Sequence, residues 1–246
     1  TAPKFPSPHN LMYLMRYWER TASNKALEMV EQTLKCMRMG GIFDHIGYGF
    51  HRYSTDRYWL VPHFEKMLYD QALLSMAYTE AYQVTGKTEY AETAKDVFTY
   101  ILRDLTSKEG GFYSAVDADS EGVEGKFYTW TYDEIQSTLS KIETNIVTKL
   151  FNLKKEGNFI DEKTGKLTGK NIPHLLDTPL YIDAEPDETL DEFHKKLNEA
   201  HEKRESWKQN LLKTIYSQKR LEVARRKLFE AREKRVHPAK DDKILT

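Results

Sequence analysis

The chain has almost no cysteine. Among its 246 residues only Cys36 carries a thiol, so no internal disulfide, CxxC redox pair or cysteine-rich zinc site can form. Because Cys36 lies between Lys35 and Met37 on a predicted helix, we interpret it as a packing residue rather than a nucleophile. Low cysteine use is typical of proteins in reducing compartments, and we expect a cytoplasmic location.

The sequence also lacks long apolar runs and a large net charge. No stretch approaches the roughly 18 consecutive apolar residues that span a bilayer, and the opening TAPKFPSP has no apolar core of the kind found in signal peptides. The formal charge is −1 at pH 7, which gives no overall attraction for nucleic acids or anionic membranes. We therefore expect a soluble protein with neither a membrane nor a nucleic-acid partner.

Helical periodicity dominates the first half of the chain. Apolar residues recur at three- and four-residue spacing through several segments. These segments are 11–20, 23–39, 67–84 and 89–105. Because short connections join them in pairs, the sequence predicts two helical hairpins, at about 10–39 and 66–105.

Each of these hairpins runs into a double glycine followed by an apolar residue. The two exits, Gly40-Gly41-Ile42 and Gly110-Gly111-Phe112, lie 70 positions apart. Ser23 is placed to cap the second helix, and Gly40 to supply a left-handed residue after it. Equivalent exits predict an array of helical hairpins, in which each pair buries its apolar faces against its neighbours.

The second half of the chain is less regular. A weaker third hairpin is predicted at 131–151, irregular structure at 155–186 and long basic helices at 187–236. The long loop at 110–130 has glycines at turn positions, which favours a short β-hairpin there. We therefore predict an all-α fold with long loops.

Residues 48–70 combine aromatic rings and charges at high density. The stretch YGFHRYSTDRYWLVPHFEKMLYD holds seven aromatic side chains beside eight ionisable ones. A structural loop usually relies on Gly, Pro, Asn, Asp and Ser, and burying titratable groups among rings is unfavourable unless they are paired. A ligand pocket needs both kinds of side chain, so this stretch indicates a binding or catalytic site.

The functional interpretation of this stretch is an acid–base site. A carboxyl group of Glu65 or Asp70 would act as acid or base, and an imidazole of His51 or His63 would carry protons. The remaining polar and aromatic residues would bind the substrate, Arg52 by holding a hydroxyl or carboxylate and the rings by stacking on a sugar. These binding residues are Arg52, Tyr53, Asp56, Trp59 and also Tyr58.

The structural alternative is a buried ion network. Arg52, Asp56, Glu65 and Asp70 would then lock the loop to the following helix, while the histidines bond backbone carbonyls. Geometry separates the two interpretations. A glutamate within reach of a histidine and beside an open pocket favours catalysis, whereas Glu65 and Asp70 fully paired with Arg52, Arg57 or Lys66 favour the network.

A second group of acids lies in AVDADSEGVEGKF. Its Asp117, Asp119 and Glu121 imitate the start of a calcium loop, but Tyr128 stands where the bidentate glutamate should be. Two ligands spaced as in His63-x-Glu65 are likewise weak evidence for zinc. We therefore expect no metal and no cofactor.

Equivalent exits of neighbouring hairpins should open at the same end of the array. We therefore expect Asp117 to face Glu65 across a cavity, with Asp119 and Glu124 as further substrate contacts. Two such carboxylates could protonate a glycosidic oxygen and activate water. The alternative is a turn whose Asp and Ser side chains bond their own backbone.

Several phrases of the sequence, taken together, resemble one family. They are PKFPSP at 3–8, GFHRYSTD at 49–56, WLVPHFEKMLYD at 59–70, GGFYSAVDADSEGVEGKFYTW at 110–130 and DDKILT at 241–246. The chain resembles the thioredoxin-domain-containing proteins typified by spermatogenesis-associated protein 20 and its bacterial YyaL-type relatives. The resemblance covers nearly the whole chain and is loosest at 175–235.

The resemblance implies a thioredoxin-like domain followed by an α/α toroid of the six-hairpin glycosidase and N-acylglucosamine 2-epimerase type. The thioredoxin-like domain and the rest of the toroid are missing from these residues, so residues 1–246 would form part of one incomplete toroid. An incomplete ring would leave apolar helix faces exposed. The resemblance also hints that Asp242 faces the cavity, although a solvated turn explains Asp241 and Asp242 equally well.

Two functions therefore remain open. The first is a carbohydrate-active enzyme, either an epimerase or isomerase that uses histidine and carboxylates, or a glycoside hydrolase that uses paired carboxylates. The second is a non-catalytic sugar- or peptide-binding or regulatory module attached to the thioredoxin-like domain. The link to sugars comes from fold analogy, which says little about reaction type.

Overall fold

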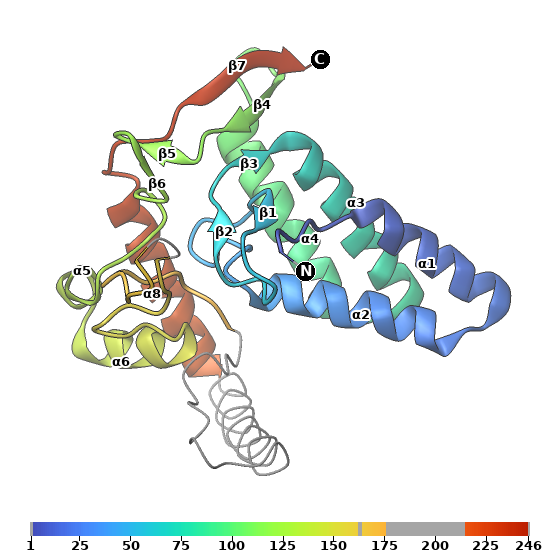
Figure 1. The fold of residues 1–246 in the computed structure, drawn as a ribbon, viewed down its shortest axis with the longest axis horizontal. Helices are drawn as coiled ribbons and strands as arrows, with labels where there is room; N and C mark the ends of the chain where they lie inside the picture. Colours follow the sequence, from blue (N-terminus) through green and yellow to red (C-terminus); the bar gives the residue numbers. More distant parts are fainter. Residues whose placement is uncertain (1, 162–163, 176–214, 246) are drawn as a thin grey trace, which may run out of the picture.

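The computed structural model describes residues 2–161, 164–175 and 215–245. Its first part is built from helices that lie where the periodicity predicts them. They are α1 (Pro8–Thr21), α2 (Asn24–Met39), α3 (Leu68–Thr85) and α4 (Thr88–Tyr100), which continues into the π-helical turn η1 (Ile101–Leu105). Helix α1 packs on α2 and α3, and α3 packs on α4 (Figure 1), so two stacked hairpins enclose one apolar core.

A second group of helices lies apart from the first in Figure 1 and has its own core. It consists of α5 (Tyr132–Thr138), α6 (Lys141–Leu150) and α8 (Ile215–Arg232). Thr131 and Ser140 begin the first two with capping boxes, each closed by a glutamate three residues later. The expectations for 176–186 and 187–214 lie outside the described residues.

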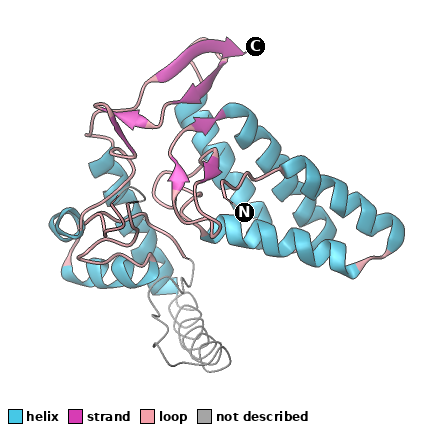
Figure 2. Ribbon diagram, in the orientation of Figure 1, coloured by secondary structure: helices cyan, strands magenta, loops and turns pink. Residues whose placement is uncertain are grey.

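Short strands connect the helical groups, and the all-α expectation is wrong in this respect (Figure 2). They are β1 (Tyr53–Ser54), β2 (Pro62–His63), β3 (Lys66–Met67), β4 (Phe112–Val116), β5 (Asp119–Ser120), β6 (Val123–Glu124) and β7 (Lys240–Leu245). The predicted hairpin within 110–130 exists as the antiparallel pair β5 and β6. The missed sheet has the order β3-β4-β7, because β4 is rich in strand-forming residues and both its edges find a partner.

The first double glycine has a different role from the predicted one. Gly40 follows α2 in an extended conformation (φ −72°, ψ 170°) and is not left-handed. A Cβ atom on Gly40 would lie 2.3 Å from the carbonyl oxygen of Trp59, and one on Gly41 would lie 2.1 Å from that of Leu60. Close approach of two backbones therefore explains these glycines. Ser23 occupies the N-cap position of α2, but its side chain makes no capping hydrogen bond.

A buried ion triad joins three distant segments. The carboxylate of Asp44 lies 2.8 Å from Lys66 Nζ and 2.9 Å from Arg232 Nη1, so the loop after α2 is tied to β3 and to the last residue of α8. The backbone N–H groups of Ile46 and Gly47 donate to the same carboxylate, each over 3.0 Å. Asp44 is thereby saturated with donors, which is the condition for a buried charge to be tolerated.

Aromatic rings enclose this triad. Lys66 Nζ lies 4.4 Å from the ring centre of Tyr100 and 4.8 Å from that of Tyr128, and it donates to the carbonyl of Tyr48 over 2.7 Å. Burial lowers the pKa of Lys66 to about 8, although the negative charge of Asp44 acts to raise it. Burial opposes ionisation of Asp44 as well, yet Arg232 and Lys66 hold its pKa well below the usual value. The triad is therefore charged at neutral pH.

The helical content fits part of a helical toroid, and the incomplete ring stays a prediction. An apolar groove of about 710 Å³ runs along α3 and α4, where Met76, Phe98 and Leu102 are exposed. No helix in the described part of the chain has the length and apolarity needed to cross a bilayer.

We expect Asp44→Asn to lower the free energy of unfolding by about 3–5 kcal/mol, because it leaves Lys66 and Arg232 buried without a counter-charge. Urea denaturation followed by circular dichroism measures the change. The matched control is Glu80→Gln, which breaks the bidentate pair with exposed Arg16 and should cost much less than Asp44→Asn, because solvent screens an exposed pair. Equal losses in the two variants would show that the triad has no special place in the fold.

Candidate functional site

Short antiparallel pairings fix the residues of the first loop. Strands β1 and β2 place Tyr53 opposite His63, and their rings stack with centroids 4.9 Å apart. The backbone N–H of Arg52 donates to the carbonyl of Glu65 over 2.8 Å. Arg52, His63 and Glu65 are thereby held together on a rigid edge, and all three side chains are partly exposed.

His63 lies between two carboxylates, one from each loop. Its Nδ1 is 2.7 Å from Glu124 Oε1, and its Nε2 is 3.8 Å from Glu65 Oε2. The backbone N–H of Phe64 donates to the same Glu124 oxygen over 3.3 Å. The structure therefore brings the two predicted loops together through the imidazole of His63.

Glu65 is held from its other side by a cation. Arg52 Nη1 donates to Glu65 Oε2 over 2.9 Å, and Arg52 Nε donates to the hydroxyl of Tyr69 over 3.1 Å. Hydrogen bonding to Glu65 raises the pKa of Arg52. Of the other two cations considered as partners, Lys66 pairs with Asp44, and Arg57 lies over the ring of Tyr58. The ion-network interpretation thus holds for Arg52 with Glu65 alone.

Asp70 is the unusual carboxyl of this cluster. It lies in the first turn of α3, and its Oδ2 is buried without a hydrogen-bond partner among the residues that the structure describes. Burial raises the pKa of Asp70 to about 7, with Arg52 lowering it and Glu65 raising it further. Two neighbouring carboxyls therefore have unlike environments: Glu65 is ion-paired, and Asp70 keeps its proton up to neutral pH.

His51 lies in the core and not in this partly exposed cluster. Its Nδ1 donates to the carbonyl of Phe64 over 2.9 Å. Its ring also makes T-shaped contacts with the rings of Phe64 and Tyr128. Burial and the charge of Lys66 hold the pKa of His51 well below its usual value. It is a neutral packing histidine that satisfies a backbone carbonyl, as the structural alternative predicted.

Asp56 and Trp59 shape their own loop. The carboxylate of Asp56 accepts hydrogen bonds from the backbone N–H groups of Tyr58, Leu60 and Val61 over 2.6–3.2 Å. Trp59 is 3% exposed and lies under the ammonium of Lys4, 4.4 Å from its ring centre. Neither side chain is offered to a ligand, so we leave both out of the site proposed below.

The second loop approaches the first through β3 and β4. Lys66 is paired with Val116 in this antiparallel ladder, which places Asp117 near Glu65 in the sheet register. The side chain of Asp117, however, accepts from the backbone N–H of Asp119 over 3.2 Å, the local turn that was the alternative prediction. Asp119 is exposed in β5, and Asp242 lies in strand β7 rather than in a turn.

Within the described residues, no group of three or more His, Cys, Asp or Glu side chains is arranged to hold a metal ion. Glu121 pairs with Lys126 at 2.6 Å.

Sequence reasoning missed the polar centre behind the cluster. Asp44 and Arg232 were not singled out, and Lys66 was considered only as one of three possible partners of Glu65 and Asp70 in the ion-network alternative. The hydroxyl of Tyr100 and Nε of Arg232 are buried there without hydrogen-bond partners in the described part of the chain. Strand alternation could have separated Lys66 from Glu65, but nothing in the sequence links Arg232 to Asp44, 188 positions away.

Comparison with known proteins gives clear relatives. The chain is 44% identical to mouse spermatogenesis-associated protein 20 over 192 residues, 70% of this chain and 24% of that protein. Human spermatogenesis-associated protein 20 is 43% identical over the same shares, and an uncharacterised Caenorhabditis elegans protein is 34% identical over 82% of this chain and 30% of its own length. This chain thus spans about a quarter of the length of its mammalian relatives.

Among solved structures, a family 76 glycoside hydrolase (mannosidase) from Bacteroides thetaiotaomicron aligns with a TM-score of 0.38 and 16% identity, over 55% of this chain and 36% of the other. A second family 76 enzyme, from a bovine strain of that species, aligns with a TM-score of 0.39 and 14% identity, over 56% and 28%. Alignments at this level carry no argument about reaction or substrate. No family model matches the chain. Sequence identity with the mammalian proteins shows that the chain belongs to the family of spermatogenesis-associated protein 20.

Proposed function

We propose that the junction of the two loops is a proton-transfer site for a sugar or a similar polyol. The observation that carries this proposal is the pair of unlike carboxyls, Glu65 ion-paired with Arg52 and Asp70 buried with a pKa raised to about 7. A protonated carboxyl can act as an acid while an ion-paired carboxylate beside it acts as a base. The other four residues of the site are Arg52, His63, Tyr69 and Glu124.

Each residue of the cluster has a role that follows from its contacts. Asp70 donates a proton, Glu65 accepts one or stabilises positive charge, and His63 passes protons between Glu65 and Glu124. Arg52 and the hydroxyl of Tyr69 bind a ligand hydroxyl or carboxylate. Exposed rings of Tyr58 and Tyr69 supply apolar faces of the kind on which sugars stack.

Two reactions use such a set. Glycoside hydrolysis needs a protonated carboxyl and an ionised one on either side of the scissile bond. Epimerisation needs a base that removes a proton next to a carbonyl group and an acid that returns one, which suits His63 between its carboxylates. The chain spans about a quarter of its mammalian relatives, so the activity of a whole family member is part of this proposal.

A second candidate is a non-catalytic sugar- or peptide-binding module. The salt bridge with Arg52 favours this candidate, because it already occupies Glu65. The cavities favour it as well, because they do not lie at the acid–base cluster. Those of about 430, 510 and 710 Å³ in the described part of the chain are lined by other residues.

The test of catalysis is to incubate the protein with a panel of mono- and disaccharides and follow the anomeric and C2 protons by NMR. Loss of the C2 proton signal in D₂O indicates epimerisation, and new anomeric signals indicate hydrolysis. We expect Glu65→Gln to lower the rate about 100-fold or more, the usual contribution of a general base or acid. Glu80→Gln, which also removes a carboxylate paired with an arginine, is the control and should leave the rate within about twofold.

The outcomes separate the two candidates. No turnover with any sugar, together with saturable sugar binding that Arg52→Gln abolishes, would select the binding module. Neither turnover nor binding would show that the cluster is a structural ion network.

The proton of Asp70 can be tested through stability. Because the pKa of Asp70 is higher in the folded chain than its ordinary value of 3.8, the folded state binds more protons between about pH 4 and pH 7, and stability falls as the pH rises through that window. Asp70→Asn mimics the protonated form at every pH. We therefore expect the free energies of unfolding to match near pH 4 and the variant to be more stable by about 2–4 kcal/mol above pH 7. A gap that does not change with pH would contradict the buried, protonated carboxyl.

A further inference from the structure

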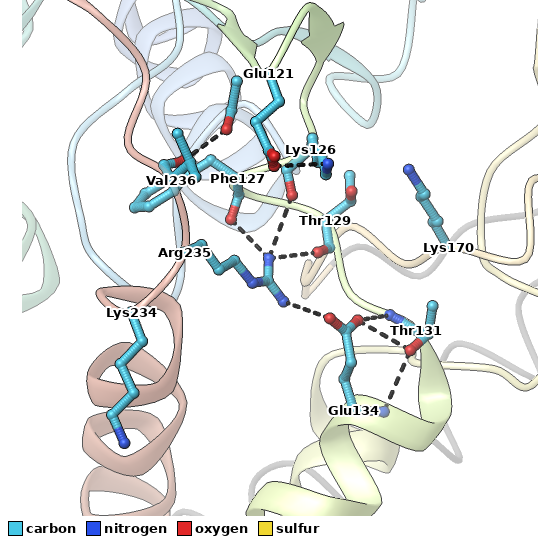
Figure 3. A pocket seen from close by; sticks show the side chains of 11 residues that line it. Glu121, Lys126, Phe127, Thr129, Thr131, Glu134, Lys170, Lys234, Arg235 and Val236 are labelled. Carbon is cyan, nitrogen blue, oxygen red and sulfur yellow. Dashed lines mark hydrogen bonds and ion pairs between the residues drawn. The ribbon is translucent and has the colours of Figure 1, made fainter.

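A cavity lies beside the turn of the β5–β6 hairpin, and no step of the proposed function uses it. It measures about 430 Å³ and lies between the second loop and the end of α8 (Figure 3). Four cations and two carboxylates line it: Lys126, Lys170, Lys234, Arg235, Glu121 and Glu134. The excess of positive charge points to an anionic ligand.

The walls of this cavity are held by hydrogen bonds. Arg235 Nη1 donates to the carbonyls of Phe127 and Thr129 over 2.7 and 2.8 Å, and its guanidinium lies over the ring of Trp130, 4.0 Å from the ring centre. The hydroxyl of Ser120 donates to the carbonyl of Val236 over 2.6 Å. The cavity is therefore formed before any ligand arrives, which keeps the ordering cost of binding low.

The two carboxylates are already neutralised. Glu134 accepts from Arg235 Nη2 over 3.1 Å, and Glu121 pairs with Lys126 at 2.6 Å. Lys170 and Lys234 have no ion pair among the described residues. Two ammonium groups are therefore left without a counter-charge.

The backbone of Lys170 is fixed although its ammonium is not. Its N–H donates to the hydroxyl of Thr168 over 3.1 Å, and its carbonyl accepts from the N–H of Asn158 over 3.1 Å. Lys234 lies just beyond the last turn of α8, next to the anchored Arg235. The backbones of both lysines are thus fixed at the cavity wall. Figure 3 shows the ammonium of Lys170 directed toward Lys126, whereas the side chain of Lys234 runs along α8 away from the other lining residues.

We propose that this cavity binds a small phosphate monoester. A phosphate monoester carries nearly two negative charges at neutral pH, and the uncompensated ammonium of Lys170, together with the positive excess of the lining, would attract such a group. Lysine is a common phosphate ligand that acts as a point charge. The guanidinium of Arg235, in contrast, already donates its hydrogen bonds to backbone carbonyls and to Glu134. The side chains of Phe127 and Val236 give the cavity an apolar wall for the carbon part of the ligand.

The test is isothermal titration calorimetry with glucose 6-phosphate, glucose, glucuronate and inorganic phosphate at low salt. We expect glucose 6-phosphate to bind at least tenfold more tightly than each of the other three, and its affinity to fall as the salt concentration rises. Lys170→Gln should weaken it about fivefold to tenfold, and Lys234→Gln should weaken it less, because that side chain points away from the cavity. Lys95→Gln removes an exposed lysine of α4 outside the cavity and should change it less than twofold.

Several results would overturn the proposal. If glucose or glucuronate bound as tightly as glucose 6-phosphate, the cavity would not require a phosphate group. If inorganic phosphate bound as tightly, the cavity would be a site for the free phosphate ion and not for a monoester. Absence of binding by all four, or an equal effect of Lys95→Gln, would show that the cavity is not a phosphate site. Since neither Glu65 nor Asp70 lines it, this inference stands or falls separately from the proposed function.

Discussion

The structure depends on one buried carboxylate. Asp44 accepts the ammonium of Lys66 and the guanidinium of Arg232, and these three groups come from the loop after α2, from β3 and from the end of α8. A charge so deep in the chain is tolerated because both carboxylate oxygens accept hydrogen bonds from donors, and because aromatic faces surround the cations. Moving any of the three segments would leave a charge unpaired, so the triad fixes how the two helical groups meet.

The candidate site is built on the outer side of the same chain segment. Neighbouring residues of an extended segment point in opposite directions, so Lys66 faces the core and Glu65 faces the partly exposed edge. Glu65 there meets Arg52 and His63, and His63 reaches across to Glu124 of the second loop. The rigidity that a proton-transfer site needs is thus supplied by the buried ions behind it.

The β5–β6 hairpin separates two chemical environments. At its far end from the turn, Glu124 contacts His63 and closes the proposed acid–base cluster. At its turn, Glu121 pairs with Lys126 beside the basic cavity. One short hairpin thereby contributes side chains to the proposed acid–base cluster and to the lining of the basic cavity.

The sequence by itself determined the helices of the two hairpins, because their 3.6-residue periodicity reflects burial of one face, and it marked both loops as dense in charges and rings. It also placed His63, Glu65 and Glu124 among the candidates. Only the tertiary structure decided which charges are buried. Asp44 and Arg232 are 188 positions apart, and Gly40 is required by the backbone of Trp59 rather than by its own φ angle. Such contacts depend on which segments of the chain lie next to each other in the folded protein, and the local sequence pattern does not specify this.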